Sequence, residues 1–266
     1  MVTAPWRLII DESPADGAWN MALDRALQMT REAGESPATL RLYRWVRPTV
    51  TLGHFQAADS VDLEFCDESG IDVVRRFTGG RGVLHDDEVT YSIVAGLDDG
   101  IPRGVAASYR LFCAGLAQAY RLLGVDASLT ALPRGDRRSA ACYLHSTAAD
   151  LSVGMRKLSG SAQVWLGSTV LQHGSFTLSR DVRREARVFR LATPAGDQLT
   201  EHAATLAEML ESRPSTARIL DASVKGMTDT LDVSPVLGSA SPRELVLAKE
   251  LLPLVARDAA HRRPRM

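Results

Sequence analysis

The chain has 266 residues, of which 45% are hydrophobic and 24% charged, a composition that excludes disordered and fibrous classes and favours a folded globular protein. A formal net charge of −1 gives no bulk electrostatic reason to expect nucleic-acid binding. The N-terminus lacks a secretory signal pattern and no stretch approaches the roughly 20 apolar residues of a membrane helix, so we expect a cytoplasmic protein without a membrane partner.

The first half of the chain predicts short strands around one helix. Residues 6–13, WRLIIDES, are typical of a short strand. Residues 17–34 place apolar side chains on one side at helical spacing, and Gly34 marks the end of that helix. Further strands are predicted at residues 38–45, 49–53, 71–77 and 82–96. We expect these strands to pair into one sheet.

The second half predicts a long helix, a strand-rich section and a helical tail. Residues 106–124 have an amphipathic pattern that ends at Gly124, residues 131–149 have no clean period, and residues 150–178 alternate as strand, turn, strand, strand. Three helical stretches follow Ala192, and the last begins with a capping box, Ser241-Pro-Arg-Glu244. We therefore predict a mixed α+β domain over residues 1–192, with a helical segment over 193–266 packed on the same domain.

A glycine-rich stretch, RRFTGGRGVLHD, runs from residue 75 to residue 86. Three glycines in four positions let a backbone turn tightly and approach a ligand closely. The stretch is not a P-loop, because no G-K-[ST] follows, and it is not a dinucleotide fingerprint, because strands flank it on both sides. A hairpin turn with solvated arginines remains the alternative.

Cys142 and Lys157 are the candidate reactive pair. Cys142 lies in or near a polar, irregular segment, and a nucleophilic cysteine needs a partly accessible thiolate near positive charge. Only three of the 31 lysines and arginines are lysines, so Lys157 indicates that a compact ammonium is wanted at that position. An exposed turn lysine and a spectator thiol are the alternatives.

The remaining thiols and the histidines do not indicate a metal. The three cysteines, Cys66, Cys113 and Cys142, are too few and too scattered for a disulfide framework, and no Cys-x-x-Cys or histidine pair suggests zinc. The motif LQHGS contains His173, but neither it nor His85 is framed well enough to name a base. We therefore predict no metal site.

The motifs taken in order resemble the lipoate-protein ligase A and biotin-protein ligase superfamily, and within it the LipM-type octanoyltransferases. They are WRLI-D, NMALD, RLYRW-RPT-TLG-FQ, RRFTGGRGVLHDDEVTYS, ACYLHS, RKLSGSAQ and LQHGS, and they cover roughly residues 6–180. The resemblance implies a ligase-like catalytic domain whose mixed, mainly antiparallel sheet is flanked by helices, with a small helical C-terminal tail.

The resemblance also implies site residues. Cys142 falls on the position that carries the acyl group, and Lys157 on the lysine that serves the carbonyl oxygen. The acyl pocket is expected to use Arg75, Arg76, Thr78, Gly79, Gly80, Arg81, Gly82, Val83, His85, Gly160, Ser161, Ala162, His173 and Gly174. Phe77 departs from the small residue or proline expected there, which bears on the pocket wall and on chain-length preference.

The implied reaction moves an octanoyl group from acyl carrier protein, through a Cys142 thioester, to a lysine of a lipoyl domain. The acceptor is either the glycine-cleavage H protein or a dehydrogenase E2 domain. No cofactor or ATP is expected, and we expect a monomer. Two alternatives stay open: an ATP-dependent lipoate or octanoate ligase that forms an acyl-adenylate, with Cys142 a bystander, and a non-catalytic acyl-binding protein.

Overall fold

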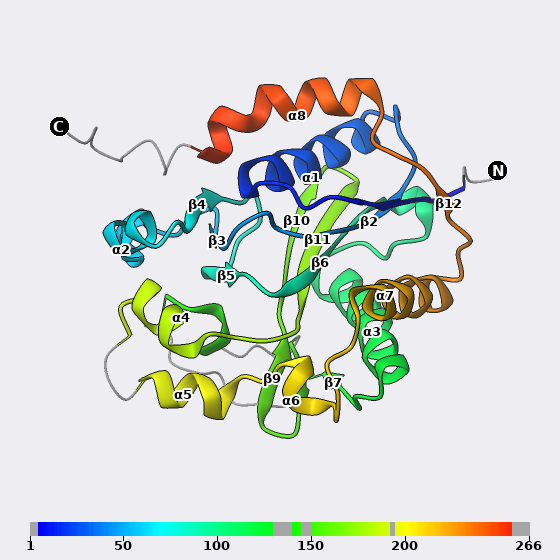
Figure 1. Ribbon diagram of the computed structural model, residues 1–266. Coiled ribbons are helices and arrows are strands. Elements are labelled where there is room, and N and C mark those ends of the chain that lie inside the picture. The colour runs from blue at the N-terminus through cyan, green and yellow to red at the C-terminus, as the bar shows by residue number, and fades with distance from the viewer. Residues whose placement is uncertain (1–4, 130–139, 145–149, 192–194, 257–266) are drawn as a thin grey trace.

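A six-stranded mixed sheet with helices on both faces forms the centre of the protein (Figure 1). The computed structural model describes residues 5–129, 140–144, 150–191 and 195–256. The strands follow the spatial order β10 (Ser161–Leu166), β11 (Thr169–Thr177), β6 (Glu88–Gly96), β2 (Thr39–Tyr43), β1 (Arg7–Ile10) and β12 (Val236–Leu237). Each neighbouring pair among the first four is antiparallel, whereas β1 pairs in parallel with both β2 and β12.

Two three-stranded sheets accompany the large one. One contains β4 (Asp72–Arg75), β3 (Thr49–Leu52) and β5 (Val83–His85), and the other contains β7 (Ser128–Leu129), β8 (Leu151–Val153) and β9 (Arg156–Ser159). The prediction that all strands of the first half share one sheet is therefore wrong. A parallel pair needs a crossover, and η1 (Ala58–Ser60) with α2 (Leu63–Glu68) supplies it between β3 and β4, which closes a separate small sheet.

Helices cover the large sheet on both faces. On one face α1 (Gly17–Glu32) packs between the sheet and α8 (Pro242–Val255), and on the other α3 (Val105–Leu123) packs with α7 (Thr216–Leu231) (Figure 1). The predicted end of α3 at Gly124 is confirmed, since that residue has a left-handed φ of 98°. The predicted capping box is also confirmed, because Ser241 and Glu244 bond reciprocally at the start of α8. No helix in the described ranges combines the length and the apolar character needed to cross a membrane.

Two of the sequence-based element counts change. Residues 150–178 hold four strands, because the chain breaks at Gly160 as it leaves β9 for β10. The described part of the tail holds four helices, α5 (Ala195–His202), α6 (Leu206–Met209), α7 and α8, in place of the three predicted. The predicted domain boundary at 192/193 and most of the irregular segment 131–149 lie outside the described residues. The remaining short elements are α4 (Val182–Val188), η2 (Leu97–Asp99) and η3 (Cys142–Leu144).

Candidate active site

A cavity of about 550 Å³, a volume that includes some open solvent, is lined by residues of the large sheet and of the β4–β3–β5 sheet. Ten of the predicted site residues line it: Arg76, Gly80, Val83, His85, Cys142, Gly160, Ser161, Ala162, His173 and Gly174. The sequence did not single out six further lining residues, Met21, Tyr43, Thr51, Thr90, Tyr143 and Ser175. Nearly all of the lining side chains are apolar, small or hydrogen-bonded to other residues, which makes the cavity suitable for an apolar chain with one reactive end.

Lys157 contacts Cys142, although fifteen residues separate them; Cys142 lines the cavity, whereas Lys157 is not one of the lining residues. The Lys157 Nζ lies 3.5 Å from the Cys142 Sγ and 3.2 Å from the Cys142 carbonyl oxygen. It also forms an ion pair with Asp150, whose Oδ2 is 3.0 Å away. Lys157 lies in β9 and its side chain is only 1% exposed. The alternative of an exposed turn lysine is therefore wrong.

A short hairpin brings Asp150 to Lys157. β8 and β9 are antiparallel, Ser152 lies opposite Lys157, and Gly154 adopts a φ of +57° at the turn between them. Two features outside the hairpin keep the lysine in position. The Ala204 amide, after α5, donates to the Lys157 carbonyl at 2.8 Å, and a Cβ on Gly160 would lie 2.9 Å from the Lys157 Cε. Gly160 therefore leaves the room that the lysine side chain occupies.

The ammonium is charged in this setting. Burial alone would lower the pKa of Lys157, but the Cys142 sulfur and the Asp150 carboxylate favour the protonated form and together raise the pKa above its ordinary value. The ring of buried Tyr143 also faces the ammonium, with 5.7 Å between Nζ and the ring centroid. Lys157 can thus donate to an oxygen that gains negative charge next to Cys142.

The glycine-rich stretch positions Cys142 through its backbone. The Gly82 amide donates to the Ala140 carbonyl at 3.1 Å, and the Cys142 amide donates to the Gly82 carbonyl at 2.9 Å. A Cβ on Gly82 would lie 2.6 Å from the ring of Phe189, which follows α4. Gly82 therefore holds the backbone at Cys142 in place, and it is not one of the residues that line the cavity.

Arg76 holds the glycine turn in place. Its Nη2 donates to the Gly79 and Arg81 carbonyls, both at 2.8 Å, and Gly80 between them has a φ of +93° that favours glycine. Burial lowers the pKa of Arg76 to about 10, with Cys142 opposing and Arg75 adding to that effect. The guanidinium stays charged at neutral pH, and both Arg76 and Cys142 line the cavity.

Other predicted site residues lie behind the cavity wall. The Arg75 guanidinium donates to the carbonyls of Gly53, His54 and Gln56, so it supports the loop after β3. Thr78 is fully buried and hydrogen-bonds His173, while Gly79 and Arg81 contribute carbonyls to Arg76. Phe77 does not form the wall either: it packs with the core beneath α1, with the Arg25 guanidinium 5.2 Å from its ring centroid.

The sequence did not predict the three carboxylates that pair with the lysine and the histidines of the site. Asp150 partners Lys157, Asp24 partners His173 at 3.3 Å, and Glu88 partners His85 at 2.6 Å. A partial signal existed for the first, since the two-residue turn of the β8–β9 hairpin sets Ser152 opposite Lys157, although the register shifts between Leu151 and Ser152 before Asp150 is reached. No comparable signal connects Asp24 to His173, because α1 and β11 are distant in sequence.

The other two thiols are poor candidates for chemistry. Cys66 in α2 and Cys113 in α3 are both buried, as expected for Cys113 from its helical context. Burial raises the pKa of Cys113 strongly, which disfavours its thiolate. Cys142 is the most accessible of the three cysteines.

Comparison with known proteins places these features in one family. Residues 16–228 match the lipoyl protein ligase A/B catalytic domain. Octanoyltransferase LipM of Moorella thermoacetica is 37% identical over 261 residues, which covers 94% of this chain and 95% of that one. The Symbiobacterium thermophilum octanoyltransferase LipM is 38% identical over 93% of this chain and 94% of its own. A solved lipoate-protein ligase A bound with ATP has a TM-score of 0.78 at 25% identity, with 94% of each chain covered.

The buried ion pair predicts a measurable stability change. Lys157→Met leaves the Asp150 carboxylate, 4% exposed, without its cation, so we expect the free energy of unfolding to fall by about 3–5 kcal/mol. Adding Asp150→Asn should recover part of that loss. Lys225→Met is the matched control, because Lys225 and Asp229 form a 2.8 Å pair that is 63% and 48% exposed, and it should cost less than about 1 kcal/mol. Urea titration measures all four proteins, and equal losses for both lysines would contradict the assignment.

Proposed function

Because this chain belongs to the lipoyl protein ligase A/B catalytic-domain family, we propose that it is an octanoyltransferase of protein lipoylation that carries the acyl group on Cys142. One observation carries the proposal: a charged, buried lysine lies within 3.5 Å of the one relatively accessible cysteine, and that cysteine lines a largely apolar cavity. A nucleophile, a donor for the carbonyl oxygen and a chain-binding space are the parts that acyl transfer through a thioester requires.

In the first step the Cys142 thiolate attacks the carbonyl carbon of an octanoyl thioester. A new carbon–sulfur bond forms, the donor's carbon–sulfur bond breaks, and the departing thiolate takes up a proton. The Lys157 ammonium donates to the carbonyl oxygen as negative charge develops on it. A donor of this kind is worth on the order of 10²–10³ in rate. We propose acyl carrier protein as the donor.

In the second step the ε-amine of an acceptor lysine attacks the Cys142 thioester. The carbon–nitrogen bond of an amide forms, the carbon–sulfur bond breaks, and the amine proton ends on the Cys142 sulfur. The intermediate divides one transfer between two large partners into two easier steps. A lipoyl domain, of the glycine-cleavage H protein or of a dehydrogenase E2, is the proposed acceptor.

An ATP-dependent ligase is the second candidate, and one observation favours it. A lipoate-protein ligase A of similar fold has been solved with ATP bound. Against it stands the position of Cys142: two backbone hydrogen bonds link residues 140–142 to Gly82, and the sulfur lies 3.5 Å from the Lys157 Nζ, an arrangement that a bystander thiol does not need. We therefore propose a reaction without ATP or another cofactor.

Intact-mass measurement tests the covalent intermediate. Mixing the protein with octanoyl acyl carrier protein, without ATP, should add one octanoyl group, which neutral hydroxylamine removes because it is a thioester. Cys142→Ser should abolish this labile adduct, whereas Cys66→Ser should not. An adduct that requires ATP, or that maps to Cys66 or Cys113, would count against the transferase.

The shape of the Lys157 donor gives a second test. Lys157→Arg keeps the charge but puts a wide planar group into a space bounded by Gly160, so we expect transfer to a lipoyl domain to fall by about 10²–10³, nearly as far as in Lys157→Ala. Lys249→Arg, on the exposed side of α8, is the control and should leave the initial rate unchanged. Near-normal transfer by Lys157→Arg would reduce the lysine to a generic charge.

A further inference from the structure

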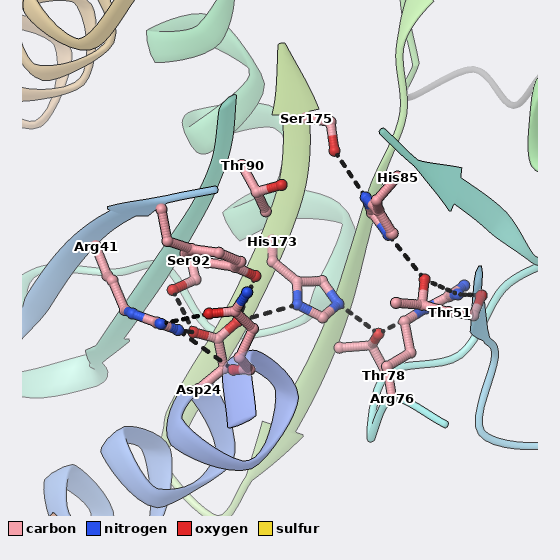
Figure 2. Close-up of polar contacts among 12 residues, drawn as sticks. Asp24, Arg41, Thr51, Arg76, Thr78, His85, Thr90, Ser92, His173 and Ser175 are labelled. Atoms are coloured by element: carbon pink, nitrogen blue, oxygen red, sulfur yellow. Dashed lines mark hydrogen bonds and ion pairs between the residues drawn. The ribbon is translucent and has the colours of Figure 1, made fainter. Parts of the chain in front are cut away.

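Two histidines of the cavity connect to one arginine through two threonines (Figure 2). The His173 Nε2 lies 2.7 Å from the Thr78 Oγ1, and the His85 Nε2 lies 2.9 Å from the Thr51 Oγ1. Arg76 donates to both hydroxyl oxygens, from Nε to Thr78 at 3.0 Å and from Nη1 to Thr51 at 3.3 Å. Each imidazole therefore has a threonine hydroxyl on one nitrogen and, as described above, a carboxylate on the other.

The protons around His173 follow from counting donors and acceptors. Thr78 is fully buried, and its hydroxyl oxygen already accepts from Arg76, which can only donate. The hydroxyl hydrogen also needs an acceptor, and among the described residues the His173 Nε2, at 2.7 Å, is the one within reach. With Nε2 accepting, the single ring proton of the neutral imidazole sits on Nδ1, where it donates to Asp24.

Asp24 accepts the hydrogen bond from the His173 Nδ1–H and stays ionised. The Arg41 Nη1 donates to it at 2.7 Å, and the hydroxyls of Ser92 and Tyr43 donate to it at 2.8 Å and 3.0 Å. Although burial acts in the opposite direction, Arg41 and His173 hold the pKa of Asp24 below its ordinary value. Asp24 is thus an ionised acceptor, and Figure 2 shows His173 between it and Thr78.

The same counting applies to His85. Its Nδ1 lies 2.6 Å from the Glu88 Oε1, which also accepts from the Thr90 and Ser175 hydroxyls, each at 2.6 Å. An ionised carboxylate can only accept, so Nδ1 carries the proton. The Thr51 hydroxyl oxygen accepts from Arg76, and among the described residues the His85 Nε2 is the acceptor within reach of its hydrogen, so the hydroxyl donates to Nε2. The Trp45 ring stacks on the imidazole with 4.2 Å between centroids and fixes its plane.

We propose that Arg76 is a positioning residue which, through the hydroxyls of Thr78 and Thr51, holds both cavity histidines as the neutral Nδ1–H tautomer. Each of the five N–H bonds of the guanidinium has an acceptor: two go to the threonine hydroxyls, and the others go to the carbonyls of Thr51, Gly79 and Arg81. Arg76, which shapes the glycine turn, therefore also sets the tautomer of His85 and His173 in the cavity wall.

This arrangement has a consequence that rests on the proposed function. Both nitrogens of each imidazole are engaged, so neither His85 nor His173 has a lone pair available to take a proton from the acceptor amine. The amine proton goes to the departing Cys142 sulfur instead. The histidines form an uncharged, rigid wall, which suits an apolar acyl chain better than an imidazolium would.

Nuclear magnetic resonance of ¹⁵N-histidine-labelled protein tests the proposal without any acyl substrate. Long-range proton–nitrogen correlation spectra, assigned with His85→Gln and His173→Gln, should show Nδ1 protonated and Nε2 unprotonated on both rings at pH 7. The spectra of the wild-type protein therefore test the tautomer of both rings directly.

Several titratable or charged groups surround the two histidines. The groups that bear on the titration of His173 are Asp24 on α1, Arg41 and Tyr43 on β2, Arg76, and His85 on β5, and Glu88 faces His85.

Substitutions then separate Arg76 from the threonines. Thr78→Val removes a hydrogen bond to the neutral ring of His173, so the titration midpoint of His173 should move to higher pH while the Nδ1–H tautomer signature of His85 is unchanged. Thr51→Val should alter the tautomer signature of His85 and leave His173 as in wild type, and Thr78→Ser, which keeps the hydroxyl, should behave as wild type. Arg76→Met should raise the midpoint of His173 and alter the tautomer signature of His85.

An Nε2 proton on either histidine of the wild-type protein would overturn the proposal, as would a Thr78→Val protein whose His173 titrates unchanged. If Arg76→Met does not fold, the paired threonine variants still decide the outcome. The spectra are independent of acyl transfer, so a failed octanoylation experiment would leave this result standing, and the reverse also holds.

Discussion

A buried guanidinium must find an acceptor for every N–H bond, and in this protein that requirement organises the site. Arg76 meets it with neutral oxygens only, three of them carbonyls and two of them threonine hydroxyls. Collecting those oxygens around one planar group folds the glycine turn, fixes two threonines and orients two histidines. Because its hydrogen-bond partners are uncharged, the arginine keeps its positive field, which acts on the nearby thiol.

The buried Lys157 ammonium also needs acceptors for its N–H bonds, but unlike Arg76 it has a carboxylate among them. Asp150 neutralises much of its charge and holds the side chain, while the remaining donors face the sulfur and carbonyl of Cys142. A point donor held on one side can hydrogen-bond an oxygen that appears beside Cys142 during reaction. The site thus combines one cation that shapes the wall with one cation that faces the chemistry.

The helices that follow the sheets support both reactive residues. Phe189, after α4, packs against Gly82, whose carbonyl accepts from the Cys142 amide. Ala204, between α5 and α6, bonds the backbone of Lys157. The cysteine and the lysine come from separate elements, so their 3.5 Å approach depends on these contacts and not on the large sheet alone.

Much of this protein could be predicted from its sequence, because the deciding signals are local. Alternation and helical spacing located most strands and helices, the capping box located the start of α8, and the choice of lysine at position 157 in an arginine-rich chain indicated a special ammonium. The ordered motifs gave the family. What the sequence did not determine was which strands are neighbours, since side-chain period fixes the faces of a strand and not its partner. It also left out Asp24, Glu88 and Asp150, because a buried charge is paired by whichever residue the tertiary structure brings within about 3 Å, as the 3.0 Å contact of Asp150 with Lys157 shows.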